Sequence, residues 1–117
     1  MKTQILFAAV VIASITPSRA AAADLEKGKA LFAQRCATCH GALGAGDGPV
    51  AQSLPPESKP RNLNEGAFKF ATDDAKMKEL LQKGGAAVGL NPLMPPTVGL
   101  SDADLENIIA FVHSLKK

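Results

Sequence analysis

Three residues with reactive side chains lie within five positions of one another. Cys36 and Cys39 are the only two cysteines of the 117-residue chain, and His40, one of its two histidines, directly follows the second. Two thiols and an imidazole at this spacing can form a redox dithiol, a small disulfide, part of a zinc site or the attachment point of a c-type haem. Each of these chemistries makes a different demand on the rest of the chain.

The rest of the chain favours the haem interpretation. A thioredoxin-like dithiol usually accompanies a strand–helix–strand pattern, and the sequence shows no strand-like alternation. A disulfide across two intervening residues closes too small a loop to stabilise much, and tetrahedral zinc needs four ligands, of which the last, His113, would be far along the chain. On a helix, Cys36 and Cys39 would project from one face, where each sulfur can form a thioether with a haem vinyl group. The sequence therefore predicts one covalently attached haem c.

In this interpretation His40 coordinates the iron through one ring nitrogen. The other ring nitrogen is then expected to donate a hydrogen bond to a backbone carbonyl, which fixes the orientation of the ring. Pro49, in the stretch Gly-Asp-Gly-Pro, is the preferred source of that carbonyl, and Pro60, in Lys-Pro-Arg-Asn, is the alternative.

The second axial position of the iron needs a second ligand, and the candidates are Met77, Met94 and His113. Met77 lies in a helical pattern and is expected to be a packing residue of that helix. His113 lies near the C-terminus beside lysines. Met94 lies in Asn-Pro-Leu-Met-Pro-Pro, where the prolines restrict the backbone and can hold a thioether in place without regular structure. We therefore expect Met94 to be the distal ligand.

A histidine and a methionine on the same iron indicate electron transfer. With both axial positions filled, a small ligand such as oxygen can bind only by displacing a side chain. Thioether coordination also raises the reduction potential of the iron. The sequence accordingly predicts a one-electron carrier and not an enzyme.

The elements that must position these residues are predicted to be helices joined by long loops. Apolar spacing predicts one helix over residues 24–39, capped by Asp24, and a shorter one over 72–82, with Thr72 or Asp73 as cap. Its inward residues are expected to include Ala75, Leu80 and Leu81.

The last helix is expected to begin at Ser101, where Asp104 completes an approximate capping box. Its apolar stripe comprises Leu105, Ile108, Ile109, Val112 and Leu115.

Gly28 lies inside the first helix, where a glycine lowers helix stability by about 1 kcal/mol relative to alanine. A close approach of another backbone is therefore expected at Gly28. The intervening segments are rich in Gly, Pro, Asn and Asp, as loops that wrap a ligand would be. The fold class is therefore all-α.

The first 20 residues have the features of a secretory signal peptide. Lys2 precedes a short apolar run, and alanines 20–23 offer cleavage after residue 20, 22 or 23. The run is shorter than the roughly 20 residues that a bilayer span requires, so no membrane span is expected in the mature domain, residues 21–117. Without Lys2 and Arg19 the basic count falls from 13 to 11, equal to the acidic count of 11. A neutral domain gives no support for nucleic-acid binding.

The mature segment resembles a class I cytochrome c, the small soluble monohaem kind. The resemblance rests on the stretches GKALFAQRCATCHG, GAGDGP, LMPP and LENIIAFVHSL. It implies a cytochrome c fold with three main helices around one haem, thioethers at Cys36 and Cys39, and iron ligands at His40 and Met94. It also implies that the first and last helices cross almost at right angles.

At that crossing, the resemblance places Gly28 and Phe32 against the face of the last helix that carries Phe111. Phe32 and Pro49 are both expected beside the cofactor. The chain departs from the common pattern at Phe111, where a tyrosine is frequent, and at Pro96, and neither change affects the ligands.

Three haem-based functions remain open from the sequence, beside a non-haem dithiol oxidoreductase. The first is a periplasmic carrier that passes one electron between redox partner proteins. The second is the haem-bearing subunit of a periplasmic dehydrogenase or oxidoreductase complex. The third is a haem enzyme or sensor in which Met94 leaves the iron. The lysines at 69, 76, 78 and 83 are expected to form a solvated face, or alternatively a rim that steers a partner toward the haem edge.

Overall fold

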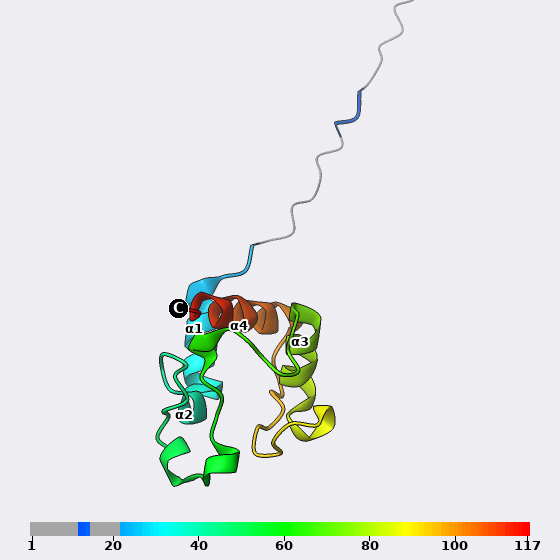
Figure 1. Cartoon of the computed structure of the whole chain (residues 1–117). Coiled ribbons are helices and arrows are strands. Elements are labelled where there is room, and N and C mark those ends of the chain that lie inside the picture. Colours follow the sequence, from blue (N-terminus) through cyan, green and yellow to red (C-terminus); the bar gives the residue numbers. More distant parts are fainter. Residues whose placement is uncertain (1–11, 15–21) are drawn as a thin grey trace, which may run out of the picture.

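The structure, a computed structural model, describes residues 12–14 and 22–117. The expected signal peptide therefore lies largely outside the described residues. In the described part all regular elements are helices, which confirms the all-α class (Figure 1). The longer elements are α1 (Leu25–Arg35), α2 (Ala37–His40), α3 (Asp74–Lys83) and α4 (Asp102–Ser114). The loops contain four short 3₁₀ helices: η1 (Ala51–Ser53), η2 (Pro56–Ser58), η3 (Leu63–Glu65) and η4 (Ala86–Val88).

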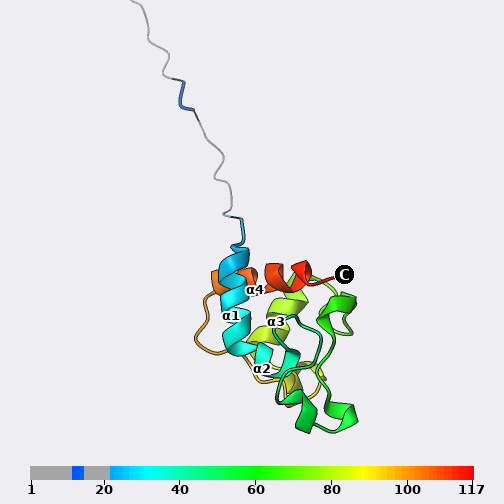
Figure 2. The same cartoon turned by 90° about the vertical axis from the view of Figure 1, so that its left-hand side faces the viewer.

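Helices α1 and α4 cross and pack directly on one another (Figure 2). At the crossing, a Cβ added to Gly28 would lie 2.0 Å from the backbone oxygen of Asn107, so only glycine allows this approach. One turn further along α1, Phe32 packs its ring against Phe111 of α4, with ring centroids 5.2 Å apart and planes inclined by 58°. The expected close approach at Gly28 and the expected contact with Phe111 are both confirmed.

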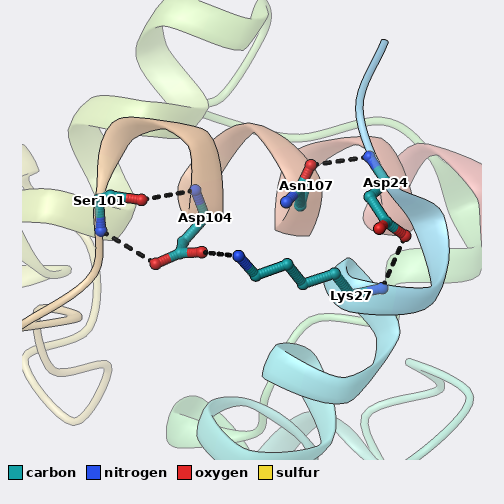
Figure 3. Close-up of polar contacts among 5 residues, drawn as sticks. All are labelled: Asp24, Lys27, Ser101, Asp104 and Asn107. Carbon is teal, nitrogen blue, oxygen red and sulfur yellow. Dashed lines mark hydrogen bonds and ion pairs between the residues drawn. The ribbon is translucent and has the colours of Figure 1, made fainter. Parts of the chain in front are cut away.

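Polar contacts fix the same crossing at the helix ends (Figure 3). The backbone N–H of Asp24 donates to Oδ1 of Asn107 at 2.8 Å, and Nζ of Lys27 lies 3.1 Å from Oδ1 of Asp104. Ser101 and Asp104 form the predicted capping box at the start of α4. The hydrogen bond from Lys27, together with those at Ser101, lowers the pKa of the Asp104 carboxyl. One carboxylate therefore both caps α4 and holds α1 beside it.

The core lies between α1, α3 and α4. The predicted stripe of α4 is buried as far as Val112, and Leu115 is partly buried. In α3, Leu80 and Leu81 are buried as expected, but Ala75 is exposed and Met77 is buried in its place. The reason is that Asp73 is the N-cap, so Ala75 falls in the first turn and the face toward α4 begins at Met77. The interpretation of Met77 as a packing residue is confirmed.

The helix expected over residues 24–39 is interrupted at Cys36. Its backbone, with φ −121° and ψ −34°, ends α1 and begins the single turn of α2. The N–H of Cys36 still donates to the carbonyl of Phe32 at 2.8 Å, and the carbonyl of Cys36 accepts from His40 at 2.9 Å. The hydrogen-bond ladder thus continues through the break into the turn that carries His40.

Candidate functional site

Helix α2 places the two thiols and the imidazole on one turn. The N–H groups of Cys39 and His40 both donate to the carbonyl of Cys36, at 3.2 and 2.9 Å. Both cysteines are free and partly buried. Burial raises the pKa of the Cys36 thiol to about 11, against the opposing effect of the Arg35 charge. Both sulfurs are therefore unpaired and available for a covalent bond.

The glycine-rich segment after α2 forms backbone hydrogen bonds to this turn. The N–H groups of Gly46 and Gly48 donate to the carbonyls of His40 and Cys39 at 2.8 and 3.1 Å, and that of Val50 donates one residue further back in α2. A Cβ on Gly48 would lie 2.4 Å from the carbonyl oxygen of the residue before Cys39, so the loop can fold under α2 only with glycine at that position. The free carbonyls at the end of the short helix are thereby satisfied.

The ring of His40 is oriented by a backbone carbonyl, as expected, but a different residue supplies it. Nδ1 of His40 lies 3.1 Å from the carbonyl oxygen of Arg61. The prediction that Pro49 supplies this carbonyl is wrong, because the carbonyl beside Nδ1 belongs to Arg61; the alternative, Pro60, is off by one residue. A carbonyl can only accept, so Nδ1 carries the proton and Nε2 keeps its lone pair. Burial lowers the pKa of His40, although the Arg61 carbonyl opposes this shift, and the ring stays neutral as a metal ligand requires.

Met94 lies in an irregular segment, residues 84–100, which we call the distal loop. The carbonyl of Met94 accepts from the N–H of Gly85 at 2.9 Å, and its N–H donates to Asn91 at 3.2 Å. The N–H and the hydroxyl of Thr97 both donate to the carbonyl of Leu81, each at 2.7 Å. The bond between Gly85 and Met94 thus closes the distal loop on itself, and Thr97 fastens the loop to α3. The partly buried Met94 packs against the core.

The other two candidates for the distal position are occupied elsewhere. Met77 is only 5% exposed and lies within the packing of α3 against α4. Nε2 of His113 lies 2.6 Å from Oδ1 of Asp74, in a surface contact that joins the end of α4 to the start of α3. Met94 is only partly buried and makes no side-chain polar contact in the described part of the chain, so it is the candidate that these contacts leave open.

The residues present fit a covalently held haem better than a bare metal ion. Among the described residues, no group of three or more His, Cys, Asp or Glu side chains lies close enough together to hold a metal. The free thiols of Cys36 and Cys39 and the oriented ring of His40 supply what haem attachment requires. Helix α2 and the distal loop lie at the same end of the domain, on opposite sides in Figure 1, and away from the crossing of α1 and α4. Residues from the two segments could hold the two faces of one planar group.

The remaining predicted site residues are placed as follows. Phe32 is 1% exposed and belongs to the core between α1 and α4, so its contact with the cofactor stays a prediction. Phe68 and Phe70 are both partly buried against the core. Nζ of Lys78 pairs with acidic residues of α4, and Nζ of Lys83 pairs with Glu79 at 2.9 Å. For these two lysines the contacts favour a solvated, ion-paired face.

Two residues with a part in the site were missed by sequence reasoning. Arg61 acts through its backbone carbonyl, which leaves no signature in the sequence beyond its place next to Pro60. Asn91 closes the turn before Met94 and donates from its side chain to Ser58. Its position three residues before the methionine was the only available signal.

A small all-α domain with a Cys-x-x-Cys-His turn at one end and a proline-rich methionine loop opposite it defines a haem-binding electron-transfer protein. The family model described as cytochrome c matches residues 25–116. The chain therefore belongs to the cytochrome c family, and haem and electron transport come with that membership.

Individual relatives agree with this assignment. The chain is 32% identical over 96 residues to cytochrome c-554(547) of Halothiobacillus neapolitanus, which covers 81% of this chain and 100% of that protein. It is 29% identical over 90 residues to the Cbb3-type cytochrome c oxidase subunit FixP of Azorhizobium caulinodans, covering 77% of this chain and 27% of FixP.

A solved structure is also similar, the reducing HAO-like protein complex Kustc0457/Kustc0458 of Kuenenia stuttgartiensis. The match has a TM-score of 0.67 and 31% identity, and it covers 78% of this chain and 42% of that one. The chain thus spans the whole of the first relative but less than half of the other two. Among residues 12–14 and 22–117, no helix has the length and apolar character needed to cross a membrane.

Proposed function

We propose that this protein is a periplasmic one-electron carrier with a single haem. In this proposal Cys36 and Cys39 hold the haem through thioethers, while His40 and Met94 coordinate its iron from opposite faces. In this proposal the chain is a carrier and not an enzyme, because His40 and Met94 would together leave no position on the iron for a substrate. When bound, the haem supplies a one-electron iron couple, and the protein supplies attachment, ligands and burial.

The observation that carries the proposal is the hydrogen bond from Nδ1 of His40 to the carbonyl of Arg61. It fixes the tautomer in which Nε2 has its lone pair, and it holds the ring against rotation. A ligand that is oriented before binding loses little further freedom and becomes more basic through the same hydrogen bond. Because His40 directly follows Cys39, attachment of the thioether would bring the iron within reach of Nε2.

Met94 is proposed as the second ligand because its loop is fixed and the other two candidates are held in other contacts. The distal loop is fastened to α3 through Thr97 and closed by the hydrogen bond from Gly85 to Met94, so the methionine would change position little between the two oxidation states. A soft thioether favours the reduced iron and raises the reduction potential. Both properties suit a carrier that must exchange electrons quickly.

A second function is favoured by the relatives that are larger than this chain. FixP is an oxidase subunit, and the similar structure is a protein complex, so a domain of this kind can also serve inside an assembly. The match to the full length of cytochrome c-554(547) favours a free carrier for this chain. Copurification with a second polypeptide at fixed stoichiometry would favour the subunit instead.

Absorption spectra of the purified protein, oxidised and reduced, test the ligand assignment. Histidine–methionine coordination predicts a weak sulfur-to-iron band in the oxidised protein and little binding of carbon monoxide to the reduced protein at neutral pH. Absence of the sulfur band, or rapid carbon monoxide binding, would instead support the enzyme or sensor. Export is tested separately by cell fractionation, which should place the protein in the periplasm with residues 1–20, or up to 23, removed.

A further inference from the structure

Asn91 forms hydrogen bonds through its backbone and through both ends of its side-chain amide. Its backbone carbonyl accepts from the N–H of Met94 at 3.2 Å, and its side-chain Oδ1 accepts from the N–H of Leu93 at 2.9 Å. Its side-chain Nδ2 donates to Oγ of Ser58 at 3.0 Å, in a partly buried contact between segments 33 residues apart. One side chain thus closes the turn that leads to Met94 and also binds a different part of the molecule.

Gly85, just after the end of α3, holds Asn91 and Met94 together. A Cβ on Gly85 would lie 2.1 Å from the carbonyl oxygen of Asn91 and 3.4 Å from Cβ of Met94. The N–H of Gly85 donates to the carbonyl of Met94 at 2.9 Å. Because Asn91 and Met94 both contact Gly85, a displacement of Asn91 also displaces Met94.

The contact with Ser58 connects the distal loop to the segment that orients His40. In the described part of the chain, the other hydrogen bonds of residues 86–96 all stay within residues 81–97. Among the described residues, the bond between Asn91 and Ser58 is the only one that leaves this range. Ser58 ends η2, and Arg61, three residues later, provides the carbonyl for Nδ1 of His40. Residues 58–61, which we call the strap, therefore contact the proximal histidine at one end and the distal loop at the other.

We propose that Ser58 and Asn91 are positioning residues that hold Met94 at a fixed distance from His40. The inference rests on the proposed function, since it assigns a role only if Met94 binds the iron. Without the contact between Ser58 and Asn91, the distal loop keeps its attachment to α3 but loses its attachment to the strap. Met94 then leaves the iron more readily when another ligand competes for it.

Imidazole titration of the oxidised holoprotein tests this directly, with loss of the sulfur-to-iron band as the readout. Ser58→Ala removes the hydroxyl and leaves both bonds within the turn of Asn91 in place. One neutral hydrogen bond contributes enough to make imidazole bind about twofold to tenfold more tightly in this variant. Ser53→Ala is the matched control, because Ser53 also ends a short 3₁₀ helix but is exposed and makes no side-chain hydrogen bond in the described part of the chain.

A double-mutant cycle separates positioning from general destabilisation. Asn91→Ala should raise imidazole affinity more than Ser58→Ala does, and its effect should be smaller in the Ser58→Ala background than in the wild type. Equal imidazole affinity in Ser58→Ala and wild type, or strictly additive effects, would overturn the inference even if the melting temperature falls. A wild-type protein without the sulfur band would instead overturn the proposed function.

Discussion

Gly28→Ala is the substitution whose effect follows most directly from the structure. The added Cβ would lie 2.0 Å from the carbonyl oxygen and 2.6 Å from the carbonyl carbon of Asn107, and 3.1 Å from Cβ of Phe111. Two of these three neighbours are backbone atoms of α4, so no side-chain rotation can relieve the overlap. The two helices would have to separate by roughly 1 Å before the nearest contact reached even the 3.0 Å limit.

The magnitude comes from two opposing effects. Alanine at a helix interior is more stable than glycine by about 1 kcal/mol. Overpacking in a close-packed core costs about 1–3 kcal/mol, and the upper end applies here because rigid backbone must move. The separation would also loosen the ring contact between Phe32 and Phe111 and the hydrogen bond between Asp24 and Asn107. We therefore expect a net loss of about 2 kcal/mol, or roughly 8–16 °C in melting temperature for a domain of this size.

The assay is thermal unfolding of the haem-loaded variant, followed by circular dichroism. Gln34→Ala is the matched control, since Gln34 is exposed on the same helix and its replacement should change stability by less than about 0.5 kcal/mol. A Gly28→Ala protein as stable as the wild type would refute the reasoning, because α1 and α4 could then not cross as closely as described.

Three further substitutions test other parts of the account. Cys36→Ser should remove one thioether and abolish stable haem attachment, leaving an unfolded chain by circular dichroism; a folded apoprotein would show that the helices do not need the cofactor as their core. Met94→Ala should keep the haem but lower the potential by on the order of 100 mV, within the roughly 0.8 V that axial ligands span; an unchanged potential in a redox titration would place the distal ligand elsewhere. Asp104→Asn should lower the melting temperature at neutral pH. Because the folded pKa of Asp104 is lowered, its stabilising effect is complete above its ordinary pKa of 3.8 and is lost as the pH falls through the lowered value. The difference between variant and wild type should therefore stay constant above pH 3.8 and shrink below it, and a difference that persists in strong acid would contradict the assignment.

Features that depend on local spacing could be predicted from the sequence. The cap at Ser101 and the stripe of α4 follow from three- and four-residue periodicity alone. The close contact between the backbones of α1 and α4 could also be predicted from Gly28. A glycine destabilises a helix interior, and the close approach of another backbone is the usual reason for one there.

Features that depend on contacts between distant segments could not be predicted. The carbonyl of Arg61 was missed because every residue has a carbonyl, and only the path of the loop decides which one meets His40. The hydrogen bond between Ser58 and Asn91 joins two irregular segments with no periodicity to align them. The assignment of Ala75 to the core failed for a more local reason, since the first turn of a helix lies at the edge of its packed face.

The central claim is that the turn from Cys36 to His40 carries one covalently bound haem. Intact mass measurement under denaturing conditions, on protein made in a host that matures c-type cytochromes, tests it most directly. The account predicts a single species whose mass equals that of the processed chain plus one haem, because thioethers survive unfolding. A species with the mass of the bare polypeptide, with haem lost on denaturation or never bound, would contradict it.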